Sequence, residues 1–203
     1  MDNQEREIKL YIKGLPAVAE RLRLCGAETV RERTLERNFR FDTPDNQLKN
    51  NGRLLRLRKD DHEHVTYKDQ AKFEEGIIVR REIEFTVNDF ESACNLFEAL
   101  GYQVTVIYEK YRSIFRLGEV VVALDELPYG DFIEIEAPNN TLIGGVAQML
   151  GLDGTKAIQT NYLGLFERLK ENLDLTIHDL TFKNFRDIEN SPGDLEVEPA
   201  DRF

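Results

Sequence analysis

Residues 5–12 read Glu-Arg-Glu-Ile-Lys-Leu-Tyr-Ile, and their pattern is that of a strand with one charged face. Side chains alternate along a strand, so Glu5, Glu7 and Lys9 share one face while the opposite face is apolar. Two carboxylates about 7 Å apart, followed by an ammonium, can hold a hard divalent cation and one phosphate oxygen. An edge strand with a solvated charged face shows the same alternation. A charged face that recurs in the other strands would favour the ligand-binding interpretation over the solvated edge strand.

The length and composition are those of a globular protein with a full hydrophobic core. The chain has 203 residues, of which 41% are hydrophobic and 32% are charged. The simplest division is one domain over residues 1–175, followed by an acidic tail over residues 176–203. No apolar run approaches the roughly 20 residues that span a bilayer, and the first residues lack the basic start and apolar core of a cleavable signal. We therefore expect a cytoplasmic protein without a membrane partner.

The charge is unevenly distributed. The formal net charge is −11, which argues against a surface that attracts nucleic acid or an anionic membrane through bulk charge. Residues 187–203 carry six acidic side chains against one Arg. Within residues 53–116, by contrast, cations recur at alternating positions. A local basic site can therefore exist inside an acidic protein.

Apolar alternation and turn residues predict eight strands. The first spans residues 5–12, and the others are expected at about 29–41, 53–58, 64–69, 77–87, 103–116, 119–125 and 131–137. Helical spacing, capping residues and glycine stops predict four helices, at about 15–25, 90–100, 139–150 and 160–172. Segments rich in Pro, Gly, Asn and Asp separate these elements.

Nearly every predicted strand repeats the pairing of charges found at Glu5 and Glu7. In the third strand, for example, Arg56 and Arg58 share a face opposite two leucines. The same parity groups Thr66 with Lys68, Arg80 with Glu82 and Glu84, Lys110 with Arg112, and Glu134 with Glu136. Asp125 closes a strand that is otherwise apolar on both faces.

An inside-out arrangement satisfies both the charged and the apolar strand faces. Helices rich in Leu, Phe and Val need a surface on which to pack, and the apolar strand faces provide it. The sequence therefore predicts an α+β fold: an eight-stranded antiparallel closed barrel with a charged interior and helices packed outside. Burying so many ions dry would cost several kcal/mol each, so the interior must be hydrated or hold a charged ligand. A polyphosphate suits the Arg and Lys side chains, and the carboxylates suit Mg²⁺ or Mn²⁺.

This ordered set of residues resembles the CYTH superfamily, also called triphosphate tunnel metalloenzymes. The family signature Glu-x-Glu-x-Lys matches residues 5–9, and the resemblance covers about residues 4–170. The further matching segments are Phe41-Asp42-Thr43-Pro44, Leu55-Arg56-Leu57-Arg58, Thr66-Tyr67-Lys68, Arg80-x-Glu82-x-Glu84, Glu109-Lys110-x-Arg112, Asp125, Gly130-x-Phe132-x-Glu134-x-Glu136 and Asn161-Tyr162. The family includes class IV adenylate cyclases, thiamine triphosphatases and inorganic triphosphatases. The resemblance implies a tunnel with an acidic end for metal and a basic wall for a triphosphate.

The resemblance also implies residue roles. Glu5, Glu7 and Glu134 look like metal ligands, with Glu136 as a helper. Asp125, together with Glu82 and Glu84, would take a second cation or orient basic side chains. The expected phosphate clamp consists of Lys9, Arg56, Arg58, Lys68, Arg80, Lys110 and Arg112, and we expect Lys9 and Lys68 to be catalytic. Arg40 departs from the family pattern, in which this position often carries an aromatic residue, so a water-activating tyrosine of the second strand is not carried over.

The function that we expect is hydrolysis of an organic or inorganic triphosphate by an enzyme dependent on Mg²⁺ or Mn²⁺. A class IV adenylate cyclase, which makes cyclic AMP and pyrophosphate from ATP, is the first alternative. A non-catalytic polyphosphate-binding module is the second, and the intact residues Glu5, Glu7, Lys9 and Glu134 argue against it. The expected partner is a small-molecule triphosphate rather than a nucleic acid, and a homodimer is compatible with the sequence.

Overall fold

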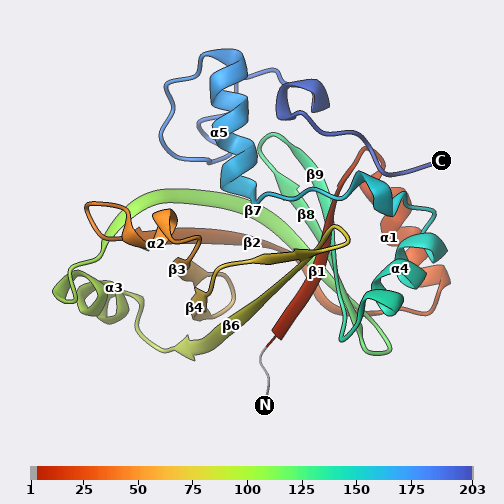
Figure 1. Cartoon of the computed structure of the whole chain (residues 1–203), viewed down its shortest axis with the longest axis horizontal. Helices are drawn as coiled ribbons and strands as arrows, with labels where there is room; N and C mark the ends of the chain where they lie inside the picture. Colours follow the sequence, from red (N-terminus) through yellow and green to blue (C-terminus); the bar gives the residue numbers. More distant parts are fainter. Residues whose placement is uncertain (1–3, 203) are drawn as a thin grey trace.

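The structure is a computed structural model of the chain, and it describes residues 4–202. Within this range the strands are β1 (Gln4–Ile12), β2 (Glu28–Asp42), β3 (Leu54–Lys59), β4 (Glu63–Lys68), β5 (Lys72–Glu74), β6 (Ile77–Val87), β7 (Gln103–Leu117), β8 (Val120–Leu127) and β9 (Gly130–Glu136). The α-helices are α1 (Leu15–Leu24), α2 (Gln47–Asn50), α3 (Phe90–Ala99), α4 (Asn140–Met149) and α5 (Tyr162–Leu173) (Figure 1). None of these helices is both long and apolar enough to cross a membrane.

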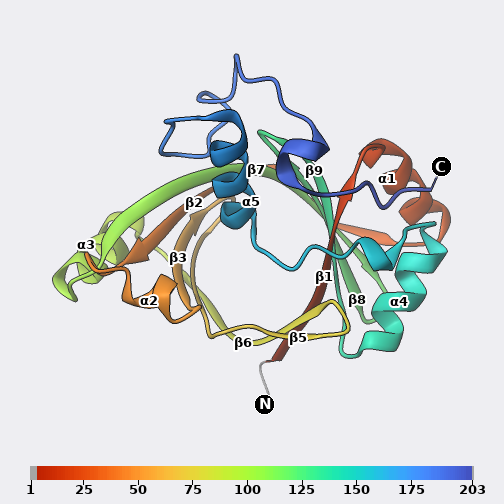
Figure 2. The ribbon, with the colours of Figure 1, turned by 45° about the horizontal axis from the view of Figure 1, so that its top comes forward.

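Eight of the strands form a closed ring. Their order is β1-β9-β8-β7-β2-β3-β4-β6, and β6 pairs back to β1, with every pairing antiparallel (Figure 2). The predicted α+β closed barrel is therefore confirmed. Two short elements were not predicted: β5, which extends the sheet beside β6, and α2, which the sequence indicated only as a turn. Both are too short to show a hydrophobic period, and α2 depends on the carboxylate of Asp42, which accepts hydrogen bonds from the Leu48 and Lys49 amides.

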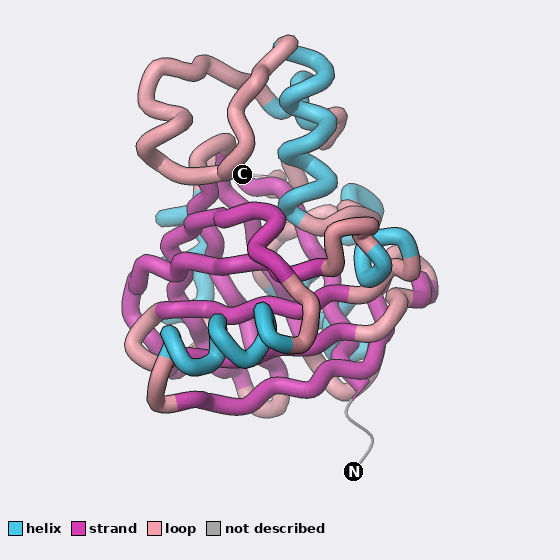
Figure 3. Tube along the Cα trace, turned by 90° about the vertical axis from the view of Figure 1, so that its left-hand side faces the viewer, coloured by secondary structure: helices cyan, strands magenta, loops and turns pink. Residues whose placement is uncertain are grey.

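The apolar faces of the strands point outward and are covered by helices. Val18 and Leu22 of α1 and Ile143 of α4 belong to one core cluster with the outward residues of β1, β8 and β9. Ala93 and Phe97 of α3 pack in a second cluster on β2, β3 and β4, and Figure 3 shows this helix lying along the outside of the barrel. The helices therefore pack on the strand faces that the sequence pattern predicted to be apolar.

One end of the barrel is covered by α5 and the C-terminal segment (Figure 2). Tyr11, Tyr108 and Phe132 point inward at this end and pack with Leu165 and Phe166 of α5 in a third cluster. Residues 176–202 join this cluster through buried side chains, among them Leu180 and Leu195. Leu180 also exchanges backbone hydrogen bonds with β7, at 3.0 Å to the Ile107 carbonyl oxygen and 2.9 Å from the Glu109 amide. The acidic segment therefore packs on the barrel.

The end of the described chain binds the backbone that leads into α1. The Asp201 carboxylate accepts hydrogen bonds from the Lys13 amide at 3.1 Å and from the Gly14 amide at 2.9 Å. Replacing Asp201 by Ala should lower the free energy of unfolding by about 1.5 kcal/mol, because two amides beside a helix N-terminus lose a charged acceptor. Urea denaturation measures this change, and Asp187→Ala, on an exposed acid of the same segment, should leave stability within about 0.5 kcal/mol. Equal effects of the two substitutions would contradict this role of Asp201.

Asp131, at the start of β9, should make the stability of the protein depend on pH. Burial and the neighbouring Glu126 carboxylate raise the pKa of Asp131 to about 6, although Arg33 opposes the shift. A folded-state pKa above the unfolded value means that ionisation weakens the fold, so this penalty is absent below about pH 4 and complete above about pH 6. We expect Asp131→Asn to stabilise the protein by about 1 kcal/mol at pH 7, since water screens part of the repulsion, and by nothing at pH 4. Denaturation at both pH values tests this, and an equal gain at pH 4 would contradict it.

Candidate active site

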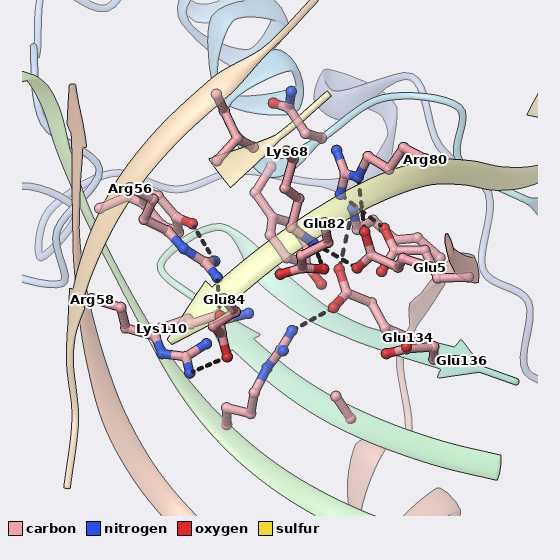
Figure 4. A pocket seen from close by; sticks show the side chains of 18 of the residues that line it. Glu5, Arg56, Arg58, Lys68, Arg80, Glu82, Glu84, Lys110, Glu134 and Glu136 are labelled. Atoms are coloured by element: carbon pink, nitrogen blue, oxygen red, sulfur yellow. Dashed lines mark hydrogen bonds and ion pairs between the residues drawn. The ribbon is translucent and has the colours of Figure 1, made fainter. Parts of the chain in front are cut away.

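The barrel encloses a cavity of about 360 Å³ whose walls are mostly charged (Figure 4). Every strand of the ring contributes at least one side chain to it. All seven residues of the expected phosphate clamp line this cavity: Lys9, Arg56, Arg58, Lys68, Arg80, Lys110 and Arg112. Four of the five expected metal ligands, Glu5, Glu7, Glu134 and Glu136, line it as well, as do Glu82 and Glu84. The structure thus brings these residues together, and their roles stay predictions.

Strand alternation and the register between β1 and β9 arrange the interior in layers. Glu7 lies opposite Glu136, Lys9 lies opposite Glu134, and Tyr11 lies opposite Phe132. Moving along β1, the interior therefore changes from carboxylates to mixed charge and then to the aromatic end beneath α5. Because inward residues repeat with period two, the order of residues in β1 sets the order of these layers.

Glu5 is held by two cations from neighbouring strands. The Lys68 ammonium lies 2.6 Å from one oxygen of Glu5, and Nε of Arg80 donates to the other at 2.9 Å (Figure 4). Burial would raise the pKa of Glu5, but these two positive charges outweigh it and lower the pKa to about 2. The same ammonium lies 2.9 Å from Glu82. Glu5 is thus ionised across the physiological range.

Glu134 is also held by cations. Lys9 Nζ lies 3.2 Å from its carboxylate, and Arg112 donates a hydrogen bond to it. Burial alone would raise the pKa of Glu134, but the charges of Arg112 and Lys9 outweigh burial and hold this pKa well below its usual range. Lys9 is only 3% exposed and lies 4.3 Å above the centre of the Tyr162 ring, so its ammonium is fixed in one place.

Glu7 and Glu136 form the part of the cavity with excess negative charge. Burial raises the pKa of Glu7, and so do the nearby carboxylates of Glu134 and Glu5. Glu136 keeps some contact with solvent, but desolvation and the nearby carboxylates of Glu5 and Glu7 likewise raise its pKa. Crowded carboxylates with raised pKa values are relieved by a divalent cation, and carboxylate oxygens are the donors that Mg²⁺ and Mn²⁺ prefer. The donor set therefore fits a hard divalent metal.

In the present arrangement the carboxylates bind cations of the protein rather than converging on one point. Among residues 4–202, no three His, Cys, Asp or Glu side chains form a group that could hold a metal ion as they stand. Glu5 faces Lys68 and Arg80, and Glu134 faces Lys9 and Arg112. Metal binding would therefore require these ion pairs to loosen.

Asp125 has a different environment from the other expected ligands. It is fully buried and does not line the cavity. Its oxygens accept hydrogen bonds from Lys110 at 3.0 Å, from Nε of Arg112 at 2.6 Å and from the Tyr162 hydroxyl at 2.7 Å. Of the two roles considered for Asp125, this geometry favours orienting the basic side chains over binding a cation.

Arg56 and Arg58 share one carboxylate on the opposite wall. Nη2 of each lies 3.4 Å from an oxygen of Glu84 (Figure 4), and Arg56 also donates to the Thr66 hydroxyl at 3.0 Å. Thr66 in turn donates to Glu84 at 2.7 Å. Both guanidinium groups are therefore aimed into the cavity by partners on β4 and β6.

Glu36, Asn38 and Tyr108 are among the interior residues that were not predicted as site residues. Glu36 is fully buried, bonds to Arg31 and lies 3.6 Å from Lys110. Tyr108 lines the cavity and accepts a hydrogen bond from Arg56 at 3.4 Å. Asn38, on β2, is paired with Tyr108 across the two strands. Alternation at positions 36, 38 and 40 carries the signal, but the earlier part of β2 has charges on both faces, so its parity is not evident from the sequence.

Comparisons with known proteins agree with the resemblance seen in the sequence. A family model described as the CYTH domain matches residues 3–141. A Methanocaldococcus jannaschii protein named putative adenylate cyclase is 28% identical over 134 residues, which cover 65% of this chain and 75% of that protein. A solved structure from Pyrococcus horikoshii OT3 is 27% identical with a TM-score of 0.66, over 78% of this chain and 97% of that chain. Another, from Vibrio parahaemolyticus, is 24% identical with a TM-score of 0.71, over 82% and 99%, and supports the fold.

Proposed function

We propose, from the premise that this chain belongs to the CYTH domain family, that it is a divalent-metal-dependent enzyme that hydrolyses a triphosphate. One observation carries the proposal: nine cationic side chains and a group of carboxylates line the same cavity of about 360 Å³. Such a cavity suits a compact, highly charged anion together with its metal. A ligand with a large apolar part would leave these charges unpaired.

The cationic wall would bind the phosphate chain. Arg guanidinium groups pair with phosphate oxygens through two parallel hydrogen bonds, and Lys ammonium groups act as compact charges. Arg56 and Arg58 are already oriented by Glu84, and Lys110 and Arg112 by Asp125. A clamp that is held in place before binding loses little side-chain entropy when the ligand arrives.

Glu5, Glu7 and Glu134 would hold the metal, with Glu136 beside them. When bound, the metal supplies Lewis-acid stabilisation of the negative charge on the phosphate. Turnover measured separately with Mg²⁺ and with Mn²⁺ distinguishes the two metals.

Lys9 and Lys68 would stabilise charge that develops during attack by water on the terminal phosphorus. Both ammonium groups are nearly buried and have fixed partners, namely Glu134 for Lys9 and Glu5 for Lys68. Burial would lower the pKa of Lys68, but Glu5 outweighs this and raises it, so Lys68 stays charged. Fixed charges in a site of low dielectric stabilise a transition state more strongly than solvent does, and phosphoryl transfer depends chiefly on such positioning.

Cyclisation of ATP is the second candidate, and a second cavity favours it. This cavity, of about 340 Å³, adjoins the first and is lined by residues of β2, α2, β7 and α5. Its volume could admit a nucleoside attached to the phosphate chain. The archaeal relative is also named an adenylate cyclase.

Product analysis separates the candidates. The purified protein is incubated with tripolyphosphate, ATP or thiamine triphosphate, each with Mg²⁺ or with Mn²⁺. We expect orthophosphate and a diphosphate as products of at least one substrate, and none in EDTA. Cyclic AMP as the main product would replace hydrolysis by cyclisation. Absence of turnover with all three compounds would favour a binding module.

A further inference from the structure

Arg40 lies where the two cavities meet. Arg40, Asn161 and Leu163 line both of them, and we call this junction the neck. On the barrel wall, Arg40 of β2 is paired with Arg56 of β3 on one side and with Val106 of β7 on the other. A ligand that extends from the first cavity into the second must therefore pass Arg40.

Arg40 differs from the other cations of the first cavity because it has no counter-ion. Within residues 4–202 its side chain makes no ion pair. Its buried Nε has no hydrogen-bond partner in this range, a feature that it shares with Arg31, Arg56 and Arg58. Every other Lys or Arg that lines this cavity has a carboxylate partner: Lys9 and Arg112 have Glu134, Arg56 and Arg58 have Glu84, Lys68 and Arg80 have Glu5, Lys110 has Asp125, and Arg31 has Glu36.

The acid closest along the strand, Asp42, makes no ion pair with Arg40, although its charge favours the charged guanidinium. Asp42 uses both of its oxygens as acceptors for backbone amides, at 2.8 Å from each of Thr43, Leu48 and Lys49. Across the strand pair, Arg40 lies opposite Arg56, and like charges in this arrangement repel. Burial lowers the pKa of Arg40, and the charges of Arg56 and Arg80 add to this effect, while Tyr108 and Asp42 oppose it. The fold thus keeps at the neck a cation without an ion-pair partner.

A β-bulge fixes the backbone beside Arg40. Arg40 pairs with Val106 whereas Phe41 pairs with Val104, so Thr105 is an extra residue in β7 at this point. The Thr105 hydroxyl donates to the Arg40 carbonyl at 3.2 Å. Bulges of this kind re-aim side chains and commonly lie next to active sites.

We infer that Arg40 binds a phosphoryl group at the neck and thereby selects an unsubstituted inorganic phosphate chain over ATP. This inference rests on the proposed function, because it assumes that a triphosphate occupies the first cavity. The end of an inorganic chain carries charged oxygens that a guanidinium binds well. In ATP, the phosphoryl group at this end of the chain is esterified to an uncharged ribose, so it presents one charged oxygen fewer to the buried guanidinium. The weaker pairing of a buried charge is costly and therefore discriminates between the two ligands.

The test compares two ligands and two variants by isothermal titration calorimetry. Binding is measured in EDTA, so that no metal-dependent turnover interferes. Wild-type protein should bind tripolyphosphate at least about tenfold more tightly than ATP. Arg40→Gln should weaken tripolyphosphate binding at least about tenfold and ATP binding less than about threefold. Arg37→Gln is the matched control, since Arg37 lies on the same strand but is 52% exposed, and it should change neither affinity by more than about twofold.

Thermal denaturation provides an independent readout. Without ligand, Arg40→Gln should melt at or above the wild-type temperature, because an unpaired cation opposite Arg56 has been removed. Arg40→Lys keeps the charge and should bind tripolyphosphate more tightly than Arg40→Gln.

Two results would overturn the inference alone. These are a similar loss of tripolyphosphate and ATP affinity in Arg40→Gln, and a marked fall in its melting temperature without ligand. Wild-type protein that binds neither compound in EDTA and turns over neither with Mg²⁺ or Mn²⁺ would instead overturn the proposed function itself. The two failures are therefore distinguishable.

Discussion

Replacing Glu7 by Gln is expected to reduce metal-dependent turnover of the preferred triphosphate at least about 100-fold. The substitution keeps the size of the side chain but removes a charged oxygen donor from the group that would hold the metal. Loss of even an outer partner of a metal ligand costs about 10- to 100-fold, so loss of a ligand should cost no less. The measurement is orthophosphate release at saturating substrate over a range of Mg²⁺ and Mn²⁺ concentrations.

The fold of this variant should be intact. Glu7 lies among other carboxylates, and loss of one like charge reduces their repulsion, so the melting temperature should be unchanged or higher. Glu119→Gln, on an exposed acid in the turn before β8, is the matched control and should retain wild-type turnover. Wild-type turnover by Glu7→Gln would exclude Glu7 as a metal ligand.

Replacing Asp125 by Asn should produce the largest loss of stability, about 3 kcal/mol. Asp125 is 0% exposed and is the carboxylate between Lys110, which is nearly inaccessible to water, and Arg112, which is half-buried. Removing one partner of a buried ionic group leaves the remaining charges uncompensated and costs about 3–5 kcal/mol, of which the Asn amide recovers a part. Guanidinium chloride denaturation at pH 7 measures the change.

Tyr162→Phe provides the comparison for this prediction. It removes the neutral hydroxyl that donates to Asp125 at 2.7 Å and leaves all the charges in place, so it should cost about 1 kcal/mol. Tripolyphosphate should restore part of the stability lost in Asp125→Asn, since its charge can pair with Lys110 and Arg112. A loss for Asp125→Asn no larger than that for Tyr162→Phe would show that the ionic group adds little.

The apolar and charged alternation predicted the barrel because it is a local property of each strand. Residues 5–12 and their counterparts in other strands assign each side chain to a face without knowledge of the partner strand. The positions of the long strands and of four helices followed from the same local patterns. The elements α2 and β5 did not, because four and three residues are too few to carry a period.

The environment of each site residue depended on strands that are distant in the sequence. Glu5 and Glu7 are two residues apart on one face and are indistinguishable by pattern. The structure places Glu5 against Lys68 and Arg80, which lower its pKa to about 2, while burial and other carboxylates raise the pKa of Glu7. Opposite shifts for the same residue type reflect the different neighbours that the ring brings to each position.

The sequence by itself therefore determined which faces are charged, that the sheet closes around them and most of the charged residues that meet inside. Only the tertiary structure decided which charges are paired. It buried Asp125 beneath Lys110 and Arg112, and it left Arg40 opposite Arg56 without a counter-ion. The physical reason is that strand periodicity is a property of neighbouring residues, whereas electrostatic compensation depends on the register between strands that are far apart in the chain.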